Sequence, residues 1–442
     1  MSDCIRKTCC NHVFIWYNGI EVIEMILRPQ YIKKIIPYVD TPFVKVLSGI
    51  RRCGKSTIFK MIIEELIKRD ITSKQILYYT FESMQNDELR TAKKLYDDVR
   101  SKLNSNGKMY LFLDEIQEVK TWERAVNSFM TDFDVDIYVT GSNSKMLSSE
   151  ISTYLTGRYI SFEVLPLSFA EYLKFRNNYD VKDDFAPNGP SGNTLYVRNY
   201  REEFARYIRY GGFPAIHLKE YTLDEAYSIV NDIYNSTIYT DIVKRSQIRK
   251  VDQLERIVKF AFDNVGRTFS AASIAKYLKS QQHTIDNETV YDYLGKLEAA
   301  FILHRCSRYD IQGKEILKTQ EKFYLADTAF RYCVLGYTPD SVAAMLENVV
   351  YLELLRRGYD VHVGKIGNTE IDFVATKQEN RMYIQISERI ERAETEEREY
   401  GRLLSIADNY PKYVLQTDDF AGGNYKGIKT MHVADFLLSE EY

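Results

Sequence analysis

The 442-residue sequence lacks the features of several protein classes. No uninterrupted apolar run approaches the roughly 18 residues that a membrane-spanning helix needs. Residues 1–24 contain no small-residue cleavage site of the kind that ends a secretory signal. The six cysteines follow neither a disulfide nor a zinc-binding spacing, which is typical of proteins from a reducing cytosol. The sequence therefore predicts a cytoplasmic protein without a membrane partner.

A surplus of positive charge is also missing. The formal net charge is -3, so any contact with nucleic acid must come from a local basic patch and not from overall attraction. The sequence does contain 45% hydrophobic and 13% aromatic residues, which is ample for packed cores. Its length favours a globular protein of about three domains.

One segment with two glycines organises the rest of the sequence. It follows the apolar run 43–47, opens the helix-patterned residues 56–68, and consists of Gly49, Ile50, Arg51, Arg52, Cys53, Gly54, Lys55, Ser56 and Thr57. The glycines permit close approach of the backbone, so successive amides at a helix N-terminus can point at phosphate oxygens. Lys55 is expected to reach the β- and γ-phosphates, and Ser56 to offer its hydroxyl to Mg²⁺. The segment predicts a site for ATP and Mg²⁺; the alternative is a glycine turn without a ligand.

A second segment ends in two carboxylates. The five apolar residues 109–113 have the pattern of a buried strand, and Asp114 and Glu115 follow directly. We expect Asp114 to bind Mg²⁺ and Glu115 to polarise the attacking water. The alternative is a solvated acidic turn after a core strand.

A third apolar segment, residues 136–141, leads to Ser142 and Asn143. Strands and helices alternate with short connections here, which favours a parallel sheet with helices on both faces and the polar strand ends at one edge. Ser142 or Asn143 is therefore expected to sense the γ-phosphate or its water. Ordinary turn chemistry is the alternative.

These segments resemble the AAA+ ATPase core of a large prokaryotic family, and the resemblance continues in residues 165–171 and 211–214, in and near a helical lid. It implies an ATP hydrolase. In the segment 155–158, Arg158 matches the family's arginine that contacts a γ-phosphate or bridges subunits, a role that implies a homo-oligomer. A surface salt bridge is the alternative for Arg158.

The next part has the spacing of a winged helix-turn-helix. Residues 254–264, 268–279 and 286–297 are predicted helices, and residues 301–305 and 322–327 are predicted wing strands. A winged helix can bind DNA through its second helix. Four acidic residues argue against DNA here: Asp286, Glu288, Asp292 and Glu298. DNA contact and a protein-binding or interdomain role both remain open.

The last hundred residues resemble the PD-(D/E)XK restriction-endonuclease core and the C-terminal domain of unknown function that accompanies this ATPase family. In that core a helix glutamate, a strand aspartate and an acid two residues before a lysine bind Mg²⁺ and orient water. The matching residues are Glu347, Asp372, Gln385 and Ser387. Because Gln385 replaces the acid and Ser387 the lysine, we expect a degenerate site without nuclease activity, unless Lys365 or Lys377 reaches it from another strand.

The predicted fold is α/β: a P-loop NTPase parallel sheet with a helical lid, then a winged-helix domain and a small restriction-endonuclease-like α/β domain. The expected ranges are 1–24 for an N-terminal extension, 25–165 for the AAA+ core, 166–250 for the lid, 251–335 for the winged helix and 336–442 for the nuclease-like domain. The predicted function is ATP hydrolysis coupled to an effector that binds DNA or a protein. The alternatives are an ATP-licensed Mg²⁺-dependent DNA nuclease and a nucleotide-dependent switch with a protein partner and no DNA.

Overall fold

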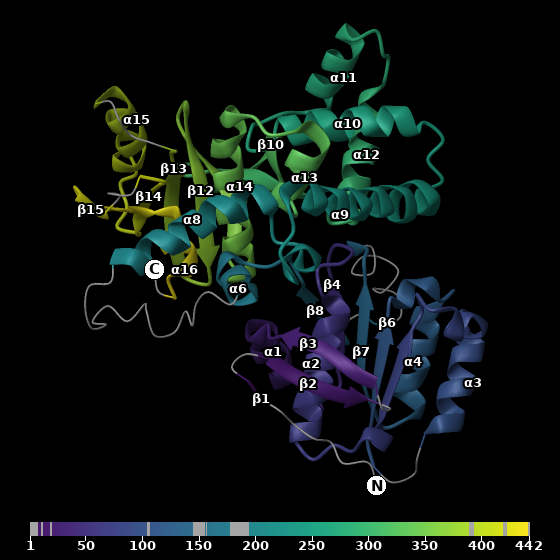
Figure 1. Cartoon of the computed structure of the whole chain (residues 1–442). Helices are drawn as coiled ribbons and strands as arrows, with labels where there is room; N and C mark the ends of the chain where they lie inside the picture. Colours follow the sequence, from purple (N-terminus) through teal and green to yellow (C-terminus); the bar gives the residue numbers. More distant parts are fainter. Residues whose placement is uncertain are drawn as a thin grey trace. The chain divides into compact units, whose positions relative to one another are not determined.

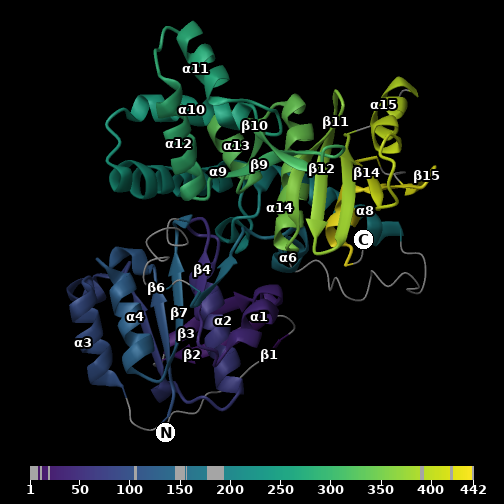
Figure 2. The ribbon, with the colours of Figure 1, turned by 180° about the vertical axis from the view of Figure 1, so that it is seen from behind.

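The structure is a computed structural model, and it describes residues 8–9, 12–17, 20–103, 107–144, 155, 157–176, 194–388, 393–418 and 422–440. The chain forms two compact units (Figures 1 and 2). The first comprises Met1–Val164 with Ala299–Phe301, and the second comprises Leu165–Glu298 with Ile302–Tyr442. No helix within these described ranges is both long and apolar enough to cross a membrane.

The first unit is built on a five-stranded parallel sheet with the order β5-β6-β7-β4-β8. Its strands are β4 (Val44–Ser48), β5 (Ile76–Thr80), β6 (Met109–Asp114), β7 (Val135–Gly141) and β8 (Tyr159–Glu163). Strands β4 and β6 are buried along their whole length, as expected for apolar runs covered on both faces. Because β7 lies between β4 and β6, the segments after all three strands share one carboxyl edge.

Helices cover both faces of this sheet, as the alternating pattern predicts (Figure 1). On one face, Phe59 of α2 (Lys55–Lys68) contacts Phe112 of β6, with ring centroids 5.1 Å apart. On the other face, α3 (Ala92–Lys102) and α4 (Trp122–Asp132) pack on a core that includes Leu111 and Leu113. Helix α1 (Pro29–Ile35) packs beside α2. Short 3₁₀ helices are η1 (Ile36–Tyr38), η2 (Ser73–Gln75), η3 (Met84–Leu89) and η4 (Ile116–Glu118).

The N-terminal segment has strands where the sequence analysis expects only an extension. Strands β1 (Thr8–Cys9), β2 (His12–Tyr17) and β3 (Ile20–Ile26) pair antiparallel in the order β1-β2-β3. The sequence contains the physical reason, since Asn18 and Gly19 separate two runs rich in β-branched and aromatic residues. That arrangement is the strongest short hairpin signal.

The second unit begins with the helices of the predicted lid. These are α6 (Phe169–Phe175), α8 (Thr194–Tyr210), η6 (Pro214–His217), α9 (Leu223–Ser236) and the π-helix η7 (Thr237–Lys244). The two lid motifs lie together, because Leu167 N donates to Gly212 O at 2.7 Å. Gly212 N donates to Asp327 Oδ2 at 2.6 Å, and a Cβ on Gly211 would lie 1.8 Å from Asp327 Oδ1. Glycine is therefore required at position 211.

The three predicted helices follow as α10 (Val251–Asp263), α11 (Ala271–Ser280) and α12 (Asn287–Ala299). The two predicted wing strands are β9 (Leu303–Asp310) and β10 (Glu315–Leu325), which pair antiparallel. Strand β9 also pairs in parallel with β11 (Asp360–Ile366). One sheet thus runs across the boundary predicted between residues 335 and 336, with eight strands in the order β10-β9-β11-β12-β13-β14-β16-β15.

The remaining elements complete this mixed sheet. The strands are β12 (Thr369–Lys377), β13 (Asn380–Ile386), β14 (Lys412–Gln416), β15 (Gly422–Tyr425) and β16 (Ile428–His432). The helices are α13 (Thr328–Leu335), η8 (Pro339–Ser341), α14 (Val342–Arg356), α15 (Ala393–Leu404) and α16 (Val433–Leu438). Tyr351 of α14 contacts Phe373 of β12. Leu403 of α15 belongs to the same hydrophobic cluster as Val374, the next residue of β12. Helices α14 and α15 therefore cover opposite faces of the sheet.

Candidate functional site

The loop between β4 and α2 has a backbone that only certain residues permit. Gly49 has a φ of +150°, and a Cβ there would lie 2.2 Å from the carbonyl oxygen of Val164. Gly54 is the N-cap of α2 with a φ of +102°, and it has no side chain that could cap the helix. Arg52, with a φ of +62°, adopts the left-handed region without being a glycine. The first amides of α2, from Lys55 to Thr57, therefore have no capping side chain at the positive end of the helix.

Lys55 connects this loop to the acidic strand end. Its side chain is 4% exposed, and Nζ donates to Gly49 O at 2.9 Å and to Ile50 O at 3.1 Å. The same Nζ lies 3.4 Å from Glu115 Oε1. Burial alone would lower the pKa of Lys55, but the nearby Glu115 carboxylate raises it overall. Lys55 therefore keeps its positive charge.

The two predicted carboxylates are held by side chains from neighbouring strands. Asp114 accepts hydrogen bonds from the Tyr78 hydroxyl at 2.8 Å and from Thr140 Oγ1 at 2.5 Å. Thr140 Oγ1 in turn accepts from Glu115 N at 2.8 Å, so one threonine of β7 positions both acidic residues. Burial would raise the pKa of Glu115, but the Lys55 ammonium lowers it overall, and the carboxylate stays ionised.

The predicted sensor residues lie on the same edge of the sheet. Ser142 and Asn143 are buried directly after β7. The Gln117 amide donates to Glu115 Oε2 and, at 3.4 Å, to Ser142 Oγ. Gln117 Oε1 is buried without a hydrogen-bond partner among the described residues. This orphaned acceptor, the ionised Glu115 beside Asp114, and the uncapped helix N-terminus fit a triphosphate with its metal ion.

The arginines of the predicted site occupy different places. The Arg51 side chain pairs with Glu82 at 2.8 Å, on the carboxyl side of the sheet. Arg158 is exposed, and its carbonyl oxygen accepts from Val44 N, the first residue of β4. The phosphate loop follows the last residue of β4, and a strand rises about 3.3 Å per residue. Arg158 therefore lies at the opposite edge of the sheet and does not join the phosphate site of its own chain.

Four residues of this site escape the sequence analysis. Thr140, Tyr78 and Gln117 contact the carboxylates and carry no motif of their own. The buried Arg28 donates from Nη1 to the carbonyl oxygen of Cys53 at 2.8 Å and braces the loop. A charged residue just before a helix-starting proline gives no signal of such a contact.

The second predicted site contains a lysine that the sequence analysis misses. Glu347 of α14, Asp372 of β12 and Gln385 of β13 do come together, with Gln385 Nε2 donating to Asp372 Oδ2 at 2.8 Å. Lys322 of β10 joins them: its Nζ lies 3.3 Å from Glu347 Oε2, 3.9 Å from Asp372 Oδ1 and 2.9 Å from Glu370 Oε1. The cation does not come from Lys377, which is exposed and donates to Arg357 O at 2.8 Å. Ser387 N donates to Leu415 O.

The charges of this acidic cluster, Lys322 with Glu347, Glu370 and Asp372, are unbalanced. Burial, followed by the charge of Glu347, raises the pKa of Asp372 to about 8. Burial also raises the pKa of Glu347, against the opposing effect of Lys322. Both raised pKa values favour a bound proton on one of these carboxylates.

The acidic cluster offers no ready-made set of three metal ligands, although Gln385 Oε1 is buried without a hydrogen-bond partner among the described residues. No three acidic, histidine or cysteine side chains in the described ranges are arranged to hold one. The Lys322 ammonium already lies among the carboxylates, and the Gln385 amide donates to Asp372.

Two family models match the chain. A model described as an AAA domain matches residues 41–173, and one described as a domain of unknown function (DUF8612) matches residues 201–341. The Walker-type ATPase PABY2304 of Pyrococcus abyssi is 13% identical with a TM-score of 0.46, covering 72% of this chain and 96% of that one. The Aeropyrum pernix ORC1 protein, solved in complex with DNA, is 14% identical with a TM-score of 0.30, covering 74% and 92%. At these scores neither likeness carries an argument.

Two sequence relatives cover most of the chain. An uncharacterized protein of Haemophilus influenzae is 36% identical over 415 residues, which is 94% of this chain and 99% of that protein. An uncharacterized protein of Methanocaldococcus jannaschii is 30% identical over 354 residues, which is 78% of this chain and 74% of that protein. The chain therefore belongs to the family of these two proteins, and its residues 41–173 are an AAA domain of the P-loop ATPase type.

Proposed function

We propose that the chain binds and hydrolyses ATP with Mg²⁺ and couples its nucleotide state to an effector formed by its C-terminal half. One observation carries this proposal: Lys55 and Glu115, from segments sixty residues apart in the sequence, meet at 3.4 Å beside an uncapped helix N-terminus. In phosphoryl transfer, a lysine at this position binds the phosphates and a carboxylate orients the attacking water.

On ATP binding, charged phosphate oxygens would replace neutral carbonyl oxygens as hydrogen-bond acceptors of the Lys55 ammonium. Two of its contacts are the backbone carbonyls of Gly49 and Ile50, which phosphate oxygens can replace at a charged ammonium. The amides from Lys55 to Thr57 would bind the same phosphates, and Arg28 holds the loop in place for them.

Mg²⁺ would be held by the Ser56 hydroxyl and Asp114, and when bound it neutralises phosphate charge and orients the reacting oxygens. Glu115, kept ionised by Lys55, would take a hydrogen bond from the attacking water and orient it. Gln117, Ser142 and Asn143 would report on the γ-phosphate, because Gln117 already connects Glu115 to Ser142.

The exposed Arg158 would act on the site of a second copy, since it lies away from the phosphates of its own chain. This is the form of the predicted arginine role that the geometry favours, and it calls for a homo-oligomer.

For the effector, DNA and a protein are the two candidate partners. The outer face of α12 carries Glu288, Tyr291 and Asp292, all exposed, which disfavours insertion of this helix into a DNA groove. A licensed nuclease is the third candidate: Lys322 brings a cation to the site from β10, whereas Gln385 still replaces one metal-binding carboxylate.

The test is ATP turnover by the full chain with Mg²⁺, alone and with single-stranded, duplex or branched DNA. Lys55→Ala should abolish turnover, whereas Lys60→Ala, an exposed lysine on the same helix, should leave it unchanged. Stimulation by one DNA form would identify the partner class, and no stimulation would favour a protein partner. Equal turnover in wild type and Lys55→Ala would refute the ATPase assignment.

A further inference from the structure

The phosphate loop contains two adjacent arginines, and their surroundings differ. Arg52 is exposed and adopts the left-handed region of the backbone. The Arg51 side chain is only 16% exposed, and its Nη1 donates to Glu82 Oε1 at 2.8 Å. Arg51 directly follows Ile50, whose carbonyl oxygen accepts from Lys55 Nζ at 3.1 Å. The Arg51 side chain therefore leaves the loop next to the contact of the ammonium that is expected to bind the β- and γ-phosphates.

Glu82 is held at the carboxyl edge of the sheet by the end of β5. Thr80, the last residue of β5, pairs with Asp114 of β6, and Phe81 N donates to Asp114 O at 3.1 Å. Arg90 Nη2 donates to Phe81 O at 2.9 Å, which fixes the backbone just before Glu82. The Glu82 side chain itself is 59% exposed. Its backbone is thus fixed, whereas its exposed side chain can change rotamer.

Both side chains lie within the electrostatic reach of the Glu115 carboxylate. Burial would raise the pKa of Glu115, but three neighbours lower it overall, in descending order Lys55, the Gln117 amide and Arg51. Partial burial, followed by the charge of Glu115, raises the pKa of Glu82, and Arg51 opposes this rise. Because Glu115 is expected to orient the water that attacks the γ-phosphate, Arg51 and Glu82 lie at the γ-phosphate end of the site.

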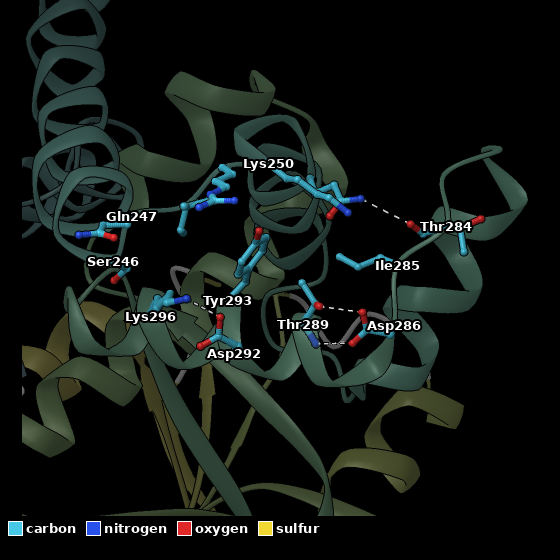
Figure 3. Close-up of a pocket in the computed structure, with 13 residues that line it drawn as sticks. Ser246, Gln247, Lys250, Thr284, Ile285, Asp286, Thr289, Asp292, Tyr293 and Lys296 are labelled. Atoms are coloured by element: carbon cyan, nitrogen blue, oxygen red, sulfur yellow. Dashed lines mark hydrogen bonds and ion pairs between the residues drawn. The ribbon is translucent and has the colours of Figure 1, made fainter.

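The pair of Arg51 and Glu82 differs from an ion pair that one helix forms by itself. In the polar pocket between η7, α10 and α12 of the second unit, Lys296 pairs with Asp292 one turn earlier on α12 (Figure 3). Such a pair follows from helix geometry. Arg51 and Glu82 are 31 residues apart, and two loops at one edge of the sheet bring them together. A partly exposed pair of this kind contributes little to stability, so a phosphate can displace its carboxylate.

We propose that Arg51 leaves Glu82 when ATP binds and contacts the γ-phosphate, so that this pair distinguishes ATP from ADP. A phosphate offers a guanidinium the same bidentate geometry as a carboxylate, and an arginine commonly binds the charge of a transferring γ-phosphoryl group. Loss of the γ-phosphate after hydrolysis would return Arg51 to Glu82. The inference rests on the proposed ATPase function. It gives the site an arginine of its own chain, in addition to Arg158 of a second copy.

The first experiment measures the affinity of the full chain for ADP and for a non-hydrolysable ATP analogue, both with Mg²⁺, by calorimetry. Arg51→Gln should weaken binding of the analogue roughly ten- to a hundredfold, the loss of a hydrogen bond between charged groups, and leave ADP binding unchanged. Arg51→Lys should recover part of the loss, because it keeps the charge without the planar fork. The matched control, Arg69→Gln, removes an arginine that pairs with Glu65 at the other end of α2 and should change neither affinity.

The second experiment is a double-mutant cycle. Glu82→Gln alone should tighten binding of the analogue and not of ADP, because Arg51 no longer has to leave an ion pair. In the Arg51→Gln background, the same substitution should have little effect, since the guanidinium that Glu82 holds is absent. A carboxylate that acted only by repelling phosphate would tighten binding equally in both backgrounds.

The proposal is overturned if Arg51→Gln weakens ADP and the analogue equally, if Glu82→Gln has the same effect in both backgrounds, or if Arg69→Gln loses as much as Arg51→Gln. These results would leave the ATPase assignment standing, because Lys55→Ala tests that assignment by itself. A wild-type chain that binds neither nucleotide would overturn both.

Discussion

The molecule contains two buried lysines among carboxylates, Lys55 and Lys322, and their surroundings differ in the number and kind of their partners. Lys55 is 4% exposed and Lys322 is 2% exposed, so burial does not distinguish them. Lys55 has one ion-pair partner, Glu115, and two carbonyl acceptors, whereas Lys322 has Glu347, Glu370 and Asp372 within 4 Å.

The pKa shifts express the same contrast. Burial would raise the pKa of Glu115, but the nearby Lys55 ammonium, with further help from the Gln117 amide, lowers it overall. With three carboxylates for one ammonium, burial and Glu347 raise the pKa of Asp372 to about 8. At the phosphate loop, the uncapped amides of α2 also favour a bound anion. Lys322, by contrast, is already surrounded by three acidic side chains. We therefore expect a buried lysine to mark a ligand site only where the ligand can replace its hydrogen-bond acceptors, as at Lys55.

Lys322→Met should produce the largest effect on stability. It would leave the acidic cluster without its cation, and removing one member of a buried ion pair costs about 3–5 kcal/mol. Urea unfolding of the variant should show this loss at neutral pH and a smaller one at pH 5, where protons replace the ammonium. The control is Lys377→Met, on the exposed side of β12. A loss no larger than in the control would mean that the cluster is solvated and weak.

Glu115→Gln should slow ATP hydrolysis about a hundredfold, or about 2.7 kcal/mol of barrier, the low end for loss of a general base. It should leave ATP binding intact, because Lys55 and the amides of α2 remain. Single-turnover kinetics with a separate binding measurement checks both parts. If the variant binds ATP as poorly as Lys55→Ala, the role given to Glu115 is wrong.

Asp372→Asn should change the pH dependence of stability. Because the pKa of Asp372 is raised to about 8, the stability that its proton contributes is complete below about pH 4 and is lost as the pH rises through about 8. The variant mimics the protonated form, so its unfolding midpoint should decline less between about pH 5 and pH 9. Parallel declines in both proteins would show that Asp372 titrates at an ordinary pKa.

The smallest expected effect is none: the unmodified chain should not cleave DNA with Mg²⁺ or Mn²⁺, with or without ATP. The acidic cluster lacks the carboxylate at Gln385 and the lysine at Ser387, and Lys322 lies among its carboxylates. A plasmid-nicking assay checks this. Cleavage that disappears in Asp372→Ala would overturn the account and promote the licensed nuclease.

How far the sequence could predict this molecule depends on whether an interaction is local. The phosphate loop and the acidic strand end could be predicted, because glycine, lysine and carboxylate positions are set by one strand-loop-helix each. Thr140 could not, because its contact with Asp114 depends on β7 being the neighbour of β6. Lys322 lies in a predicted wing strand, and only the order β10-β9-β11-β12 brings it to Asp372. The N-terminal hairpin has a local signal, because Asn18 and Gly19 separate two runs of β-prone residues in the sequence.

The most direct test of the account is equilibrium binding of a fluorescent ATP analogue with Mg²⁺ to wild type, Lys55→Ala and Lys322→Met, under conditions where all three are folded. The account predicts that Lys55→Ala binds far more weakly than wild type and that Lys322→Met binds like wild type. Wild-type affinity in Lys55→Ala, or a loss confined to Lys322→Met, would contradict it.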